Sequence, residues 1–80
     1  MPLEHHPLHR EFPEFKTQLQ ALLSSDGHFV RQAELYEELD KRIYEVERGR
    51  VAMEETLLQE LKMQRVSLKD ELAVSLRSAP

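Results

Sequence analysis

The sequence contains no cysteine and no tryptophan, and it has only two glycines among its 80 residues. The lack of cysteine excludes disulfide bonds and metal sites built on thiolates. No run of about 18 consecutive apolar residues is present, so the sequence predicts no membrane-spanning helix and no membrane partner. The first residues also lack the basic and then apolar pattern of a signal peptide. We therefore expect a cytoplasmic protein.

An excess of positive charge is also missing. The chain has 11 basic and 15 acidic residues and a formal net charge of −4, which disfavours nucleic acid as a partner. Charged residues make up 32% and hydrophobic residues 40%, a composition that is too apolar for a disordered chain and typical of long, charged helices. A chain of this length forms one domain, residues 1–80, with a small core.

Apolar residues recur at spacings of three, four and seven positions in residues 29–48, where Gln32 interrupts them, and again in residues 54–77. This spacing is that of a heptad seam, in which one face of a helix packs along another helix. Gly49 suits a left-handed C-terminal cap, so the chain is expected to turn back there. We predict an all-α fold, an antiparallel two-helix coiled-coil hairpin preceded by a short N-terminal helix. The predicted hairpin core is Phe29, Tyr36, Leu39, Ile43, Val46, Leu58, Leu61, Leu68 and Leu72.

Arg65 interrupts the apolar seam of residues 54–77. Two interpretations stand equally: Arg65 pairs with Asp40, which the hairpin register places beside it, or its aliphatic stem packs while the guanidinium reaches solvent. Lys62 and Lys69 extend a small basic strip around Arg65 that would suit an anion. Acidic residues are interleaved with this strip, so a solvated surface of mixed charge is the preferred interpretation.

The N-terminal part divides into an arm and a short helix. Pro2 and Pro7 each remove a backbone donor and restrict the preceding residue, so residues 1–11 are predicted to form a mobile arm. Residues 12–24 carry an apolar stripe at helical spacing, with Pro13 suited to the first turn. A helix this short is marginal alone in water and must dock on the hairpin.

Glu4, His5, His6 and His9 form the grouping with metal-ligand chemistry. His5 and His9 would share one face of a helix, and neutral imidazoles bind zinc, nickel or copper. Pro7 lies between them and opposes that helix, so an arm with adventitious metal affinity is favoured over a specific site. A metal-binding protein that uses these histidines is the alternative function, and no cofactor is expected.

Several segments resemble the YdcH-like family, namely HREFPEFKTQLQALLSSDGHF, HFVRQAELYEELDKRIYEVERG and ELKMQRVSLKDEL. The strongest matches are Phe12-Pro13-Glu14, His28-Phe29, Leu39-Asp40 and Leu68-Lys69-Asp70-Glu71-Leu72. The sequence departs from the family pattern at Gly27, where proline is common, and at Glu54-Glu55, where Ser-Asp often caps the last helix. The resemblance implies a helical hairpin in the bacterial cytoplasm and no particular activity, because the family has no established biochemical role.

Apolar residues beside the seam exceed what two helices can cover. Because no set of residues typical of nucleophilic catalysis can be assembled, we expect a protein that is not an enzyme but self-associates as a homodimer or docks on another protein. The competing solution is that residues 12–24 fold back and seal this surface within one chain. The candidate interface residues are Leu35, Leu57, Met63, Val66 and Val74.

Overall fold

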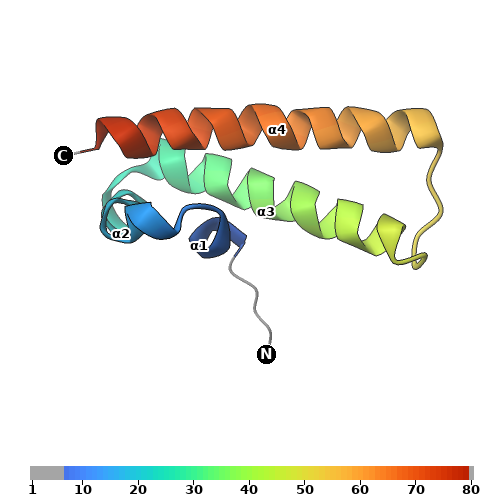
Figure 1. Cartoon of the computed structure of the whole chain (residues 1–80). Coiled ribbons are helices and arrows are strands. Elements are labelled where there is room, and N and C mark those ends of the chain that lie inside the picture. Colours follow the sequence, from blue (N-terminus) through green and yellow to red (C-terminus); the bar gives the residue numbers. More distant parts are fainter. Residues whose placement is uncertain (1–6, 80) are drawn as a thin grey trace.

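The computed structural model describes residues 7–79, which form helices and connecting loops without any strand among them. Two long helices, α3 (Gly27–Glu47) and α4 (Glu55–Ser78), lie side by side and run in opposite directions (Figure 1). The predicted all-α fold is confirmed, whereas the coiled-coil packing of the hairpin stays a prediction. The chain before them forms α1 (Pro7–Glu11), the 3-10 helix η1 (Pro13–Phe15) and α2 (Lys16–Ser25).

The N-terminal segment, residues 7–25, packs on α3 and α4 at the end that is remote from the loop between them (Figure 1). α1 lies in the stretch that was predicted as a mobile arm, so the structure corrects that expectation for residues 7–11. Pro7 takes the first position of α1, where its missing N–H is not needed. Leu8 is only 2% exposed, and burial of this side chain outweighs the local cost of the proline. Residues 1–6 lie outside the described part of the chain.

The break between α2 and α3 is a single residue, Asp26, which is shorter than the gap between the helices predicted over residues 12–24 and 29–48. Its backbone is extended, and its side-chain Oδ1 accepts a hydrogen bond from the amide of Phe29 at 3.1 Å. This contact satisfies one of the free donors in the first turn of a helix. Asp26 therefore both ends α2 and starts α3.

Gly49 ends α3 with a positive φ of 79°, as its place after the helix predicted. The amide of Gly49 donates to the carbonyl of Val46 at 3.0 Å, and the amide of Arg50 donates to the carbonyl of Glu45 at 2.9 Å. These two hydrogen bonds form a Schellman motif, which requires a left-handed residue where glycine is strongly preferred. The motif turns the chain toward α4.

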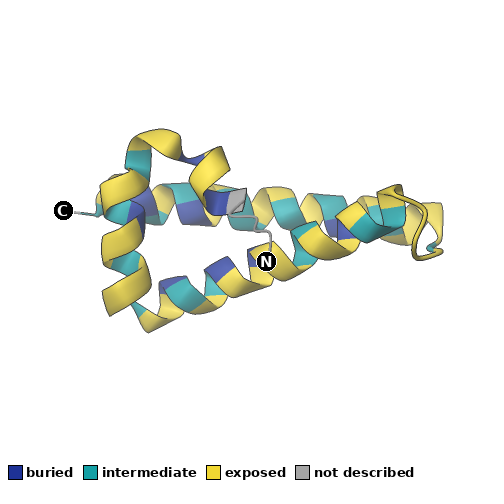
Figure 2. Ribbon diagram, turned by 90° about the horizontal axis from the view of Figure 1, so that it is seen from below, coloured by how far each residue is buried: buried dark blue, intermediate teal, exposed yellow. Residues whose placement is uncertain are grey.

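The main core lies where the N-terminal segment meets α3 and α4, and Figure 2 shows many of the buried positions gathered at that end. Ile43 and Leu61 are buried nearer the loop. The core was predicted from the contact of two helices only. Four of its members are half-buried: Leu39, Val46, Leu58 and Leu68. The main core cluster is Leu8, Phe12, Leu19, Phe29, Ala33, Tyr36, Leu72 and Leu76.

Leu72 has no exposed surface and sits in this cluster, so the substitution Leu72→Ala should lower the free energy of unfolding by about 2–5 kcal/mol. Val74→Ala, at an exposed position of the same helix, should change it by less than about 0.5 kcal/mol. Urea unfolding followed by circular dichroism measures both. Equal stabilities for the two variants would show that Leu72 does not hold the core together.

Candidate functional site

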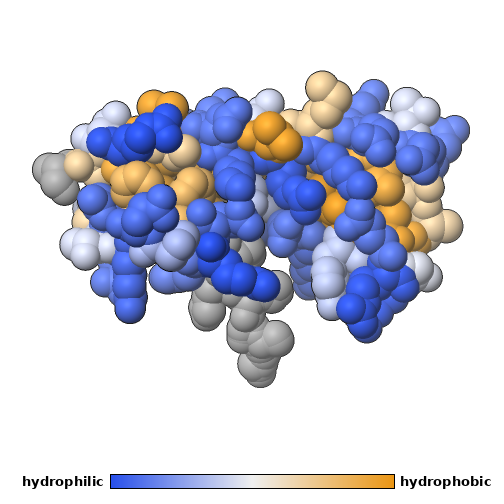
Figure 3. Space-filling view, in the orientation of Figure 1, coloured by the Kyte–Doolittle hydropathy of each residue, from blue (hydrophilic) through white to orange (hydrophobic). Residues whose placement is uncertain are grey.

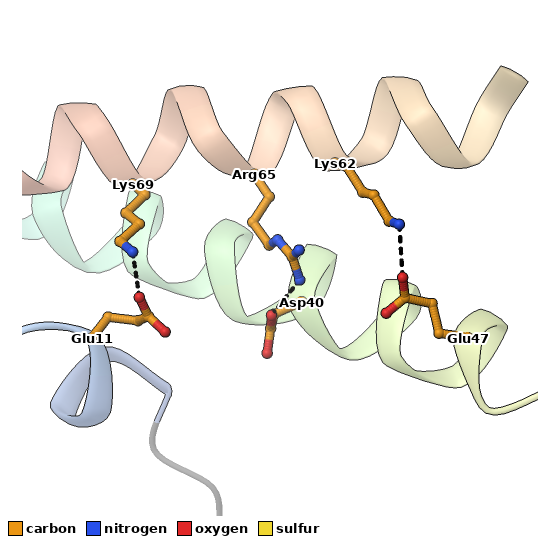
Figure 4. A network of polar contacts seen from close by, with 6 residues as sticks. All are labelled: Glu11, Asp40, Glu47, Lys62, Arg65 and Lys69. Carbon is orange, nitrogen blue, oxygen red and sulfur yellow. Dashed lines mark hydrogen bonds and ion pairs between the residues drawn. The ribbon is translucent and has the colours of Figure 1, made fainter.

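Three basic side chains of α4 reach three carboxylates along one side of the molecule (Figure 4). Arg65 Nη1 lies 2.8 Å from Asp40 Oδ1, so the ion pair that the register suggested is present. The predicted basic strip is thus matched by acidic partners from α1 and α3 and is not open to an external anion. We call this set the ion-pair row; it consists of Lys69 with Glu11, Arg65 with Asp40, and Lys62 with Glu47.

The ion-pair row joins the N-terminal segment to the long helices. Glu11 comes from α1 and pairs with Lys69 of α4, next to the buried ring of Tyr36. Burial raises the pKa of the Tyr36 hydroxyl above its ordinary value, and the nearby carboxylates of Glu11 and Asp40 raise it further, whereas Arg65 lowers it. These effects oppose ionisation of Tyr36 at alkaline pH.

At the other end of the row, Lys62 Nζ lies 2.7 Å from Glu47 Oε2. The hydrogen bond from Lys62 and its positive charge lower the pKa of the Glu47 carboxyl. Glu47 is on the last turn of α3, so this contact joins the two long helices near their connecting loop. The row serves as a set of polar links between elements.

The opposite side of the α3–α4 pair carries a groove of about 580 Å³. No residue of the N-terminal segment lines it. Leu35 is 49% exposed and Met63 is 70% exposed, while Leu39 and Leu68 are half-buried at its floor. We call it the open groove; its lining residues are Leu35, Glu38, Leu39, Arg42, Met63, Gln64, Ser67 and Leu68.

The two sides of the molecule therefore differ in how their apolar surface is covered. In the view of Figure 3, charged and polar residues lie between separate apolar areas of the surface. The ion-pair row is found on the side to which α1 contributes Glu11. The open groove is lined by apolar and polar side chains from α3 and α4 alone.

Residues 29–75 match the model of a family described as "Protein of unknown function (DUF465)". The chain belongs to the DUF465 family. The match agrees with the predicted resemblance to a small family without a known role, although it does not carry the YdcH-like name. Comparisons with curated proteins and with solved structures found no match.

The DUF465 match spans α3 without its first two residues, the connecting loop and most of α4, so it includes every residue that lines the open groove. Of the five candidate interface residues, Leu35 and Met63 line this groove. Val66 lies beside the ion-pair row instead. Leu57 and Val74 are exposed, and neither of them lines the groove or the hollow beside the row.

The histidine cluster falls mostly on residues that the structure does not describe. Glu4, His5 and His6 lie outside the described residues, and His9 is exposed on α1. Among residues 7–79 of this DUF465 member, no group of three potential metal ligands comes together. Over the same residues, every helix is too short or too polar to cross a membrane.

The raised pKa of Tyr36 predicts how the stability of the folded protein changes at alkaline pH. Since the unfolded chain releases the tyrosine proton at a lower pH than the folded chain does, the free energy of unfolding should fall as pH rises past the ordinary value of 10.0. Tyr36→Phe should remove part of this fall, because it removes the buried hydroxyl. Urea titrations from about pH 9 to about pH 11 measure the slopes. Identical slopes for wild type and Tyr36→Phe would contradict the assignment.

Proposed function

We propose that this DUF465 protein is a non-enzymatic helical module that associates with a second copy of itself through the open groove. The observation that carries the proposal is the exposure of Leu35 and Met63 on a side that no other part of residues 7–79 covers. The proposal includes a location in the bacterial cytoplasm and a relationship to the YdcH-like family, both of which the sequence resemblance implies. The non-enzymatic part is supported by the ion-pair row, in which each carboxylate already has a basic partner.

The free energy available from covering the groove is substantial for so small a protein. Fully burying one large aliphatic side chain is favourable by roughly 1.5–3 kcal/mol. Leu35 and Met63 would gain part of that amount each, and the half-buried Leu39 and Leu68 would lose their remaining contact with water. Exposed apolar side chains that line one groove, as Leu35 and Met63 do, are typical of an interaction site.

The N-terminal segment is not free to supply this cover. Leu8, Phe12 and Leu19 are buried in the main core, and Glu11 is tied to Lys69 on the other side of the long helices. Moving the segment to the groove would expose that core. The cover for the groove is therefore expected from another molecule, and twofold pairing of identical chains is the commonest closed arrangement. Two α3–α4 pairs would then form a four-helix bundle.

Light scattering behind a sizing column tests this proposal with the full chain. At micromolar concentration the mass should be twice that of the 9.4 kDa chain. Leu35→Ser should shift the equilibrium toward the monomer, because it places a hydroxyl at the groove. Val74→Ser is the matched control, since Val74 is exposed on α4 away from the groove. A monomer mass that does not change on about tenfold concentration would refute self-association.

A further inference from the structure

Helix α3 presents a stripe toward the open groove that is suited to packing on another helix. Leu35, Leu39, Arg42 and Val46 follow one another at spacings of four, three and four residues. The first three line the groove, and Val46 is half-buried one turn further on. Such spacing keeps side chains along one face of a helix over three turns, as in a helix–helix seam.

The α4 side of the groove offers less apolar surface for a partner. Gln64 and Ser67 line the groove from α4, and Leu68 is half-buried beneath them. Met63 remains at the outer edge of the groove and is its most exposed apolar residue. The central contact of a second copy is therefore expected on α3, with α4 contributing mainly the methionine at the rim.

Two charged residues of α3 line the same groove one helical turn apart. Glu38 and Arg42 are both exposed, and neither forms an ion pair or a hydrogen bond within the described residues 7–79. The charges of the ion-pair row, by contrast, are all matched within the chain. The groove thus carries one acidic and one basic group that form no ion pair within residues 7–79, so a molecule docked there has both charges available to it.

We infer that two copies pack α3 against α3 in antiparallel orientation, with Glu38 of each chain opposite Arg42 of the other. This inference rests on the proposed self-association and names its geometry. If Leu35 faces Val46 of the second copy, the same register places Leu39 against the aliphatic stem of Arg42 from that copy. Glu38 then lies within one turn of the guanidinium, and the twofold axis repeats the ion pair.

The charges also decide between the two possible orientations of the helices. A parallel twofold pair would bring Glu38 next to Glu38 and Arg42 next to Arg42, so each contact would join like charges. An antiparallel pair replaces both repulsions by attractions. Juxtaposition of like charges disfavours wrong pairings strongly, and it sets orientation even where it adds little to affinity. A second copy thus fits the groove in apolar pattern and in charge.

Charge reversal across the proposed interface tests the geometry. The variants Glu38→Arg and Arg42→Glu should each lose self-association by at least about tenfold in dissociation constant, because each places like charges at both contacts. Mixed in equal amounts, they should form a heterodimer, since two arginines of one chain then face two glutamates of the other. The chain that carries both substitutions should self-associate like the wild type.

Glu37→Arg and Lys41→Glu are the matched controls, with the same charge changes at the same spacing on α3 but outside the groove. They should leave the dissociation constant unchanged and show no preference for each other when mixed. Native mass spectrometry distinguishes homodimers from heterodimers by mass, and circular dichroism verifies that each variant is helical.

The possible outcomes separate the inference from the proposal beneath it. If the wild type is a dimer but the two groove variants dimerise as it does, the α3 pairing is wrong and self-association stands. If instead both variants are monomers and their mixture forms no heterodimer, the reciprocal ion pair between Glu38 and Arg42 is wrong. A monomeric wild type overturns the proposed function together with the inference.

Discussion

Packing of the N-terminal segment on α3 and α4 is the constraint on which the rest of the structure depends. Two helices in contact can shield only a narrow stripe on each, and a chain of 80 residues has few other elements to add. Leu8 and Leu19 supply the missing layer against Phe29 and Leu72. Since a helix as short as α2 is marginal alone in water, the segment and the long helices depend on each other for stability.

Docking of the N-terminal segment makes the molecule two-sided. On the covered side, the ion-pair row lies along the contact between the elements, and burial next to its carboxylates raises the pKa of Tyr36. On the other side, nothing within residues 7–79 covers the open groove. A single short segment can shield one side only, so the fold itself produces an apolar surface, and self-association is the use that we propose for it.

The sequence could predict the features that depend on local chemistry. The apolar spacing indicated the two long helices, and Gly49 marked the end of the first because glycine adopts the left-handed conformation readily. The hairpin register was enough to bring Arg65 to Asp40. Each of these features involves either neighbouring residues or one simple geometric step.

Features that depend on the packing of the N-terminal segment were not predictable from the sequence in the same way. The prolines argued against structure in residues 7–11, but the burial of Leu8 is a long-range effect that local preferences do not contain. Leu76 is buried because α2 reaches α4, which a two-helix register does not include. Likewise, Val66 and Leu35 are both apolar, exposed and adjacent to the seam, and the sequence alone does not tell that Leu35 lines the open groove whereas Val66 lies beside the ion-pair row.

The most direct test of this two-sided account is hydroxyl-radical footprinting of the wild-type chain over a concentration series, read by mass spectrometry. Leu8 and Phe12 should resist oxidation at every concentration, because they are buried within one chain. Leu35 and Met63 should be oxidised readily in dilute solution and become protected as concentration rises. Ready oxidation of Leu8 and Phe12, or labelling of Leu35 and Met63 that does not change with concentration, would contradict the account.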